Sequence, residues 1–207
     1  MNNLEAKLDM QVIAYLTKVE DMPEVKALLS GDISKEIYIK FLKTFYVLED
    51  ISQRAVNLAS EMTKDAHPYL SKRFDVCAKG ELGHAEIALE DLEQLGVKGV
   101  NISEIPESSE YDNLLQNCAR DFPLGILGHS YLFENTSGTM FPKQNPLIFP
   151  SRFVEVHAKE DPGHSVAIKR TIRNIENDLN EEQENLILSF TNKSGKYLLD
   201  LFNTLSN

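Results

Sequence analysis

The sequence contains few cysteines and no long apolar run. Its 207 residues include only two cysteines, Cys77 and Cys118, which lie far apart and form no CxxC pair. We therefore expect two free, mostly buried thiols in a reducing compartment rather than a disulfide framework. No apolar run is long enough to span a bilayer, and the acidic N-terminus lacks the apolar core of a signal peptide. These absences predict a cytoplasmic protein without a membrane span.

Positive charge is also scarce. The chain has 21 Lys and Arg against 32 Asp and Glu, which gives a net charge of −11, and its basic residues form no stripe. Nucleic acid is therefore not an expected partner. The sequence has no GxGxxG or Walker pattern, so Gly125 and Gly128 are better explained as close-packing positions than as a phosphate loop. Some of the acidity could instead face bound cations inside the protein.

No stretch alternates with period two for long enough to form a strand, and helical periodicity covers most of the chain. Residues 136–150 hold Gly138 and three prolines, so we expect no regular helix there. The pattern predicts one all-α domain over residues 1–207, a bundle of about seven to nine helices. Its clearest expected helices are Pro23–Leu29, Ser34–Met62, Pro68–Leu92 with Gly96 as C-cap, Arg152–Ile175, and one capped by Asn180 that runs to Phe202.

The stretch from His157 to His164 is the most informative segment. It places two imidazoles and a carboxylate at positions 157, 161 and 164. On a helix, residues separated by four and by seven positions share one face. Two histidines with a carboxylate are typical ligands of non-haem iron that activates oxygen. The motif therefore predicts a metal site at His157, Asp161 and His164.

Pro162 bears directly on this geometry. Proline removes a backbone donor and disfavours a helical conformation at the preceding residue, Asp161. The ligand helix could be kinked, or it could begin afresh at Pro162 with Asp161 as its N-cap. In the second case His157 would precede the helix, and the shared face would be lost.

Two further segments could supply ligands to the same site. Glu81 and His84 lie three positions apart, a spacing that recurs in carboxylate-bridged di-metal bundles when both residues share a helix face. Glu134 lies in an otherwise apolar helix, where an unpaired carboxylate is costly to bury. The alternatives are a solvated helix surface for the first pair and an ion pair with a Lys or Arg for Glu134. Taken together, the three segments predict a site for two metal ions.

The order of these residues resembles the metal-binding pattern of the haem-oxygenase-like diiron oxidases and oxygenases. The short Glu-x-x-His spacing looks most like that of the alkene-forming fatty-acid decarboxylases. The resemblance covers about residues 35–200 and rests on ligand order and helix pattern rather than on close sequence identity. It implies a haem-oxygenase-like bundle, two ferrous ions (Fe²⁺) and dioxygen as co-substrate. The implied metal ligands are Glu81, His84, Glu134, His157, Asp161 and His164.

The resemblance also implies a class of reaction, the oxidation of a small amine, amino acid or fatty-acid-like substrate. The six ligands do not select among N-oxygenation, desaturation and C–C cleavage. We expect the apolar lining of the site to choose the substrate. A homodimer is plausible by resemblance alone. The candidate lining residues are Phe41, Phe45, Leu48, Leu127 and Tyr131.

Other functions stay open on the same fold. Metal-free members include thiamine-salvage hydrolases of the TenA type and a quinone-cofactor synthase, although Cys77 and Cys118 lack the setting of a catalytic nucleophile. A haem oxygenase is disfavoured because the first helix contains no histidine that could ligate haem. A non-catalytic helical binding protein, whose metal residues are structural, is the remaining alternative.

Overall fold

The computed structural model describes residues 4–100, 105 and 108–205, and these residues form helices without a β-strand. The predicted all-α class is confirmed, and nine α-helices in the described ranges agree with the expected seven to nine. In chain order they are α1 Leu4–Asp21, α2 Pro23–Ser30, α3 Lys35–Thr63, α4 Pro68–Gly80, α5 His84–Gln94, α6 Ser108–Asp121, α7 Gly125–Met140, α8 Arg152–Ile175 and α9 Glu181–Thr204, with a short 3₁₀ helix, η2 Phe141–Lys143.

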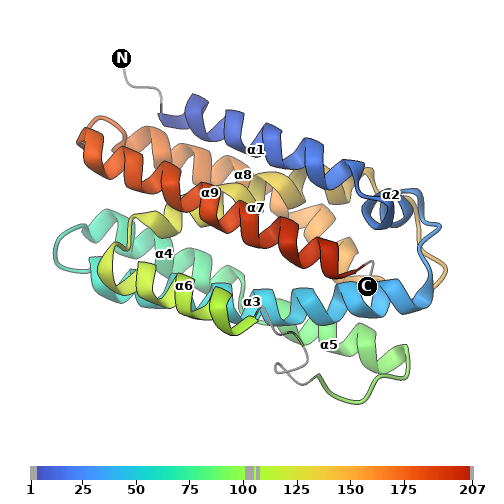
Figure 1. Ribbon diagram of the computed structural model, residues 1–207. Coiled ribbons are helices and arrows are strands. Elements are labelled where there is room, and N and C mark those ends of the chain that lie inside the picture. The colour runs from blue at the N-terminus through green and yellow to red at the C-terminus, as the bar shows by residue number, and fades with distance from the viewer. Residues whose placement is uncertain (1–3, 101–104, 106–107, 206–207) are drawn as a thin grey trace.

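The helices form two groups that face each other. Figure 1 shows α1, α7, α8 and α9 running alongside one another, while the long helix α3 lies below them with α4, α5 and α6. Helix α7 packs against both α8 and α9, and α3 packs against α4, α5 and α6. The candidate site lies between the groups, where α3, α7, α8 and the turn between α4 and α5 come together.

Several helix ends follow directly from the sequence. The side chain of Ser34 accepts a hydrogen bond from the backbone N–H of Ile37 and starts α3. Asn180 and Gln183 form a reciprocal capping box at the start of α9. Gly31 ends α2 with a φ of 83°, a left-handed conformation that glycine adopts without strain. The predicted starts at Ser34 and Asn180 are confirmed, and α2 ends at Ser30, one residue beyond the predicted Leu29.

The expected helix from Pro68 to Leu92 is wrong, because the chain breaks it into two. Helix α4 ends at Gly80, and α5 begins at His84. Gly83 has a φ of 100°, which turns the chain between the two helices. The physical cause is two glycines within four residues, since glycine is the weakest helix former after proline. Glu81 and His84 therefore do not share a helix face. Glu81 follows the end of α4, and His84 begins α5, with the turn between them.

Helix α8 runs without interruption through Pro162, so the predicted alternative of a fresh start at that residue is wrong. Pro162 lies on the exposed side of the helix, where the carbonyl left unpaired by the missing N–H can bond water. Gly138 of α7 lets the two backbones approach, since a Cβ there would be 3.0 Å from the carbonyl oxygen of Asp161. Ser165 also donates a hydrogen bond to the backbone oxygen of Glu134. Packing against α7 therefore holds α8 intact.

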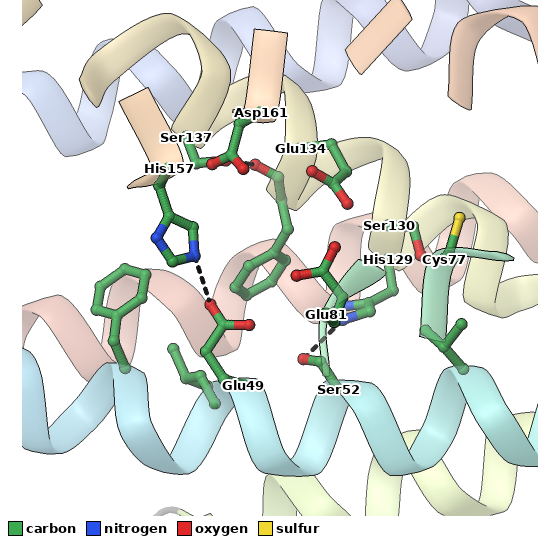
Figure 2. A pocket seen from close by; sticks show the side chains of 14 residues that line it. Glu49, Ser52, Cys77, Glu81, His129, Ser130, Glu134, Ser137, His157 and Asp161 are labelled. Atoms are coloured by element: carbon green, nitrogen blue, oxygen red, sulfur yellow. Dashed lines mark hydrogen bonds and ion pairs between the residues drawn. The ribbon is translucent and has the colours of Figure 1, made fainter. Parts of the chain in front are cut away.

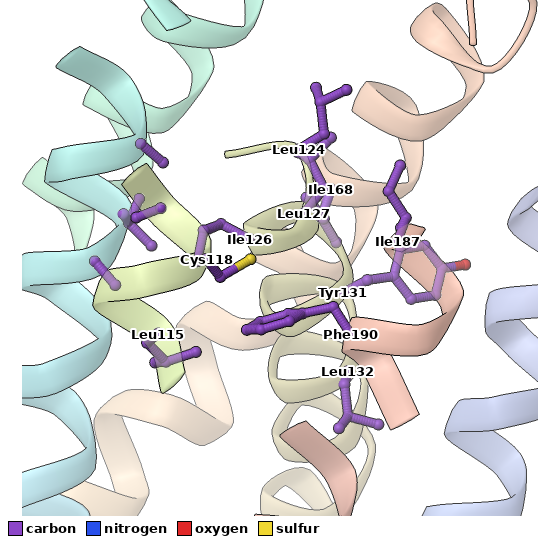
Figure 3. Close-up of a cluster of buried hydrophobic side chains, with 14 of the residues drawn as sticks. Leu115, Cys118, Leu124, Ile126, Leu127, Tyr131, Leu132, Ile168, Ile187 and Phe190 are labelled. Carbon is purple, nitrogen blue, oxygen red and sulfur yellow. The ribbon is translucent and has the colours of Figure 1, made fainter. Parts of the chain in front are cut away.

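The expectation that residues 136–150 lack regular helix is partly wrong. Helix α7 continues to Met140, and only the prolines beyond it end the regular structure. Figure 3 shows the apolar face of α7 at the centre of the larger core. A Cβ on Gly128 would be 2.3 Å from Thr191 Oγ1, and one on Gly125 would be 2.5 Å from Cys118 Sγ. Both glycines are close-packing positions, as predicted.

The cysteines and the membrane prediction also agree with the sequence. Both thiols are free; Cys118 is buried and donates to the backbone oxygen of Phe122, whereas Cys77 is half-buried. None of the described helices has the length and apolar character needed to cross a bilayer.

Candidate metal centre

Seven ionisable side chains converge between the two groups of helices. All six predicted ligands are among them, and the seventh, Glu49 of α3, was missed. They come from five places in the chain, so only the folded protein brings them together. They are Glu49 from α3, Glu81 from the α4–α5 turn, His84 from α5, Glu134 from α7, and His157, Asp161 and His164 from α8.

One group of three consists of Glu49, His84 and His157. Each offers a ligand atom, and the three atoms lie within 4.8 Å of one another. His157 Nε2 is 3.4 Å from Glu49 Oε1, and the rings of His84 and His157 are 4.6 Å apart. His157 Nδ1 is 2.7 Å from the backbone oxygen of Phe153, which can fix the proton on Nδ1. That contact leaves the Nε2 lone pair directed at the group, the arrangement typical of metal-binding histidines.

The other group of three consists of Glu81, Glu134 and His164, whose ligand atoms also lie within 4.8 Å of one another. His164 Nδ1 is 3.3 Å from Glu134 Oε2 and 3.5 Å from Glu81 Oε1. The second oxygen of Glu81, Oε2, is 2.9 Å from His84 Nδ1. Glu81 therefore reaches both groups, as a carboxylate that bridges two metal ions would. Asp161 Oδ1 lies 3.7 Å from His164 Nδ1.

Several of these atoms are close together without forming hydrogen bonds. Among the described residues, His84 Nδ1, His157 Nε2, His164 Nδ1 and Asp161 Oδ2 are buried and have no well-directed partner. A buried polar atom without a partner costs about 1–3 kcal/mol. The lone pairs converge on shared space instead of on one another, and cations placed there would satisfy them. By this observation the residues fit a metal centre.

Burial and repulsion between carboxylates raise two acidic pKa values. Burial, and then the charge of Glu81, raises the pKa of Glu134 to about 7. Burial also raises the pKa of Asp161 to about 6, with the charges of Glu49 and Glu81 adding to the effect. Although burial alone would raise the pKa of Glu81 as well, its contact with His84 lowers it below the ordinary value. The site thus holds more negative charge than it can stabilise without cations.

The pKa values of the three histidines are also raised, but by their contacts with carboxylates and against the effect of burial. The contact with Glu134 raises the pKa of His164 to about 9. Burial lowers the pKa of His157, but Glu49 outweighs it and raises the value to about 9. The pKa of His84 is also raised, because its contact with Glu81 outweighs burial. Protons therefore stabilise the cluster in the role that metal ions would take, and metal binding would release them.

A buried carboxylate outside the seven-residue cluster fixes the start of α8, the helix that carries three of the candidate ligands. Ser151, the residue before α8, makes no side-chain cap. Asp91 of α5 replaces it, since its Oδ2 accepts a hydrogen bond of 2.9 Å from the N–H of Phe153. Asp91 is fully buried and lies near the positive end of the α8 dipole. The contact fixes the position of α5, which carries His84, relative to α8, which carries His157.

Comparison with solved structures identifies the architecture. A TenA homologue from Pyrococcus furiosus superposes with a TM-score of 0.83 at 14% identity, over 98% of this chain and 100% of that one. A domain of unknown function with a heme oxygenase-like fold from Shewanella denitrificans gives 0.81 at 18% identity, over 100% and 93%. This chain has the haem-oxygenase-like fold. Heme oxygenase-1 from the cyanobacterium Synechocystis, in complex with heme, is more distant, with a TM-score of 0.65 at 16% identity over 99% and 92%.

These likenesses show the haem-oxygenase-like fold and not the activity, because each identity is low. No family model matches the chain, and no curated protein matches it. The resemblance stated from the sequence is therefore confirmed for the fold, while diiron chemistry stays a proposal.

Next to the candidate ligands lies a small cavity (Figure 2) that leaves about 60 Å³ for water-sized molecules. Phe45 and Leu48, two of the predicted substrate residues, line it. Phe41 does not line it; its ring lies behind Phe45, with ring centroids 4.5 Å apart, so its predicted place in the lining is wrong. Leu127 and Tyr131 do not line this cavity either, so the prediction that they contact the substrate here is wrong. They belong to the core on the other face of α7, where the hydroxyl of Tyr131 donates to Asp9 of α1.

Glu49 was missed, although the sequence carried a signal for it. Phe45, Glu49, Ser52 and Val56 follow one another at four-, three- and four-residue intervals, and all four line the cavity. Such spacing places them on one face of α3. A carboxylate within a stripe that is otherwise apolar or weakly polar is the same signal that singled out Glu134.

Proposed function

We propose that this chain is a non-haem diiron enzyme that uses dioxygen to oxidise a small organic molecule, such as an amine, an amino acid or a fatty-acid-like compound. The observation that carries the proposal is the convergence of two three-ligand groups, joined by Glu81, around buried nitrogen atoms without directed partners. Histidine and carboxylate together are ligands suited to iron.

The chemistry of the donors fits two ferrous ions. Glu49, His84 and His157 offer two imidazoles and one carboxylate to one ion. Glu81, Glu134 and His164 offer two carboxylates and one imidazole to the other, with Asp161 adjacent. The four carboxylates of the site would balance the four positive charges of two ferrous ions. Bound here, those ions would supply the electrons that reduce dioxygen.

The rest of the site prepares the chemistry without taking part in it. The backbone oxygen of Phe153 orients His157, and Asp91 anchors the helix that carries three of the ligands. Phe45, Leu48 and Phe133 form the apolar part of the cavity wall. A substrate that displaces water from such a wall would strengthen electrostatic contacts and suppress side reactions of an oxidising centre.

The cavity also bears on the substrate. Room for only a few water-sized molecules favours a compact substrate, or one end of a longer molecule, beside the metal ligands. Ser130 and Ser137 place two hydroxyl groups on the α7 side of the wall, which can orient a polar substituent. The first helix has no histidine to ligate haem, so haem oxygenase chemistry is not supported.

A metal-free hydrolase is the second candidate, because TenA homologues are among the structural neighbours and Cys77 lines the cavity. Burial, and then the charge of Glu134, raises the pKa of the Cys77 thiol to about 11. A thiol with so high a pKa is a poor nucleophile at neutral pH. The buried cluster of histidines and carboxylates would also lack a role in such an enzyme.

Anaerobic loading with ferrous iron, followed by metal counting and exposure to oxygen, tests the proposal. Two irons per chain, one for each ligand group, and an oxygen-dependent change in visible absorption are expected. A chain that binds no iron under these conditions, while hydrolysing an aminopyrimidine of the thiamine-salvage type, would support the second candidate instead.

A further inference from the structure

A second polar network lies beside the candidate metal ligands and includes none of them. It consists of Ser52 of α3, His129 of α7 and Tyr111 of α6. Ser52 Oγ is 3.1 Å from His129 Nε2, and the Tyr111 hydroxyl is 3.3 Å from His129 Nδ1. Ser52 and His129 both line the cavity, as Figure 2 shows. Because each ring nitrogen has a partner, His129 is not free to bind metal.

The protonation state of His129 follows from its surroundings. The ring is 2% exposed, and burial lowers its pKa to about 3. A neutral imidazole carries one N–H and one lone pair. If the Tyr111 phenol donates to Nδ1, the Nε2–H donates to Ser52 Oγ, and every group in the network has a role. In this tautomer, His129 can receive a proton from Tyr111.

Tyr111 is suited to lose an electron and a proton together. Its side chain is fully buried, and burial raises its pKa well above the ordinary value. The phenolate is therefore inaccessible, and oxidation of the neutral phenol requires a base within hydrogen-bond reach. The structure provides that base in His129, whose ring contacts Phe133 on the cavity wall at 4.5 Å between centroids.

A second tyrosine continues the path to the surface. The rings of Tyr111 and Tyr197 lie 5.6 Å apart between centroids. The hydroxyl of Tyr197 donates a hydrogen bond of 3.2 Å to Glu110 Oε2, which is exposed. The aromatic rings thus form a continuous route from the cavity, through His129 and Tyr111, to a tyrosine with its own proton acceptor at the surface.

We propose that Tyr111 is a redox-active residue that supplies one electron to the oxidised iron centre when no substrate is present. The inference rests on the proposed function. The phenol gives its electron to the centre and its proton to His129 Nδ1, which leaves a neutral phenoxyl radical beside an imidazolium. Tyr197 then gives an electron to this radical and its proton to the Glu110 carboxylate, while the imidazolium returns its proton to Tyr111. A soluble one-electron reductant, such as a thiol, restores Tyr197.

Electron paramagnetic resonance tests the relay. Protein loaded with ferrous iron and exposed to oxygen without substrate should show an organic radical, whose signal narrows when the tyrosine rings are deuterated. Tyr111→Phe should abolish this signal, and Tyr197→Phe should prolong it. Tyr38→Phe is the matched control, because Tyr38 is also fully buried but its hydroxyl has no hydrogen-bond partner among the described residues. The control should leave the signal unchanged.

A measurement without iron tests the proton acceptor separately. Nitrogen NMR of the metal-free protein should show His129 neutral at physiological pH, with its proton on Nε2, and Tyr111→Phe should shift the Nδ1 resonance. A proton on Nδ1 would overturn the relay whatever the iron does. Iron that reacts with oxygen while Tyr111→Phe keeps the radical would overturn the relay alone. Failure of the protein to bind iron would overturn the proposed function and the relay together.

Discussion

Replacing Glu134 with glutamine should stabilise the metal-free protein at alkaline pH. The carboxylate is 16% exposed and lies 3.3 Å from His164 Nδ1. Burial, followed by repulsion from Glu81, raises its pKa from the ordinary 4.5 to about 7. A folded protein that holds a proton the unfolded chain has lost becomes less stable as pH rises between these two values. Above pH 7 the full cost of the charge is present, and glutamine removes it.

The size of the effect follows from the pKa shift. One pKa unit corresponds to about 1.4 kcal/mol, so the rise to about 7 sets an upper limit of about 3 kcal/mol. The substitution also removes the carboxylate that raises the pKa of His164, and this loss offsets part of the gain. We therefore expect a net stabilisation of about 1–2 kcal/mol at pH 8.

Glu81→Gln is the matched control with the opposite sign. Burial raises the pKa of Glu81, but His84 and the other histidines lower it below the ordinary value. This carboxylate therefore contributes stability that is present above its unfolded pKa and is lost as pH falls. Urea unfolding in the presence of a chelator, at pH 5 and pH 8, compares both variants with the unsubstituted protein. A destabilised Glu134→Gln protein at pH 8, or a difference independent of pH, would refute the reasoning.

Four further predictions concern packing, helix propensity, capping and thiol reactivity. Gly195→Ala should cost at least about 2 kcal/mol, since a Cβ there would be 2.2 Å from the Tyr15 ring. Gly163→Ala, with no atom within 4 Å, should stabilise α8 by up to about 1 kcal/mol; urea unfolding measures both. Asp91→Ala, which removes the acceptor of the Phe153 N–H, should cost about 1–2 kcal/mol and raise amide exchange in the first turn of α8, measured by hydrogen exchange. Cys77 should alkylate much more slowly than a free thiol at pH 7.5, because its pKa is raised to about 11; mass spectrometry measures the rate.

Much of the fold could be predicted because local signals specify it. The helix that follows Ser34 and the one that follows Asn180 begin where side-chain caps predict, and the close packing of Gly128 agrees with its apolar surroundings. The break at Gly83 was missed, because a continuous apolar pattern outweighed two nearby glycines. At Pro162 the sequence left a continuous Arg152–Ile175 helix and a break both open, and packing between α7 and α8 keeps the helix continuous.

The sequence singled out most of the candidate ligands but not their geometry. Spacing and unusual burial of charge singled out six residues, and the fold brings all six together. Glu49 was missed, although it shares a face of α3 with Phe45 and Val56, because a single carboxylate in a long amphipathic helix is normally solvated. Leu127 and Tyr131 were misplaced because α7 is buried on nearly every side, so its sequence does not show which face lines the cavity.

Anomalous diffraction at the iron edge, from crystals loaded anaerobically with ferrous iron, tests the central claim most directly. Two peaks are predicted in each chain. One should lie among Glu49, His84 and His157, and the other among the carboxylates of Glu81 and Glu134 and the imidazole of His164. No peak at these residues under conditions that saturate the protein with iron, or peaks only at surface carboxylates, would contradict the account.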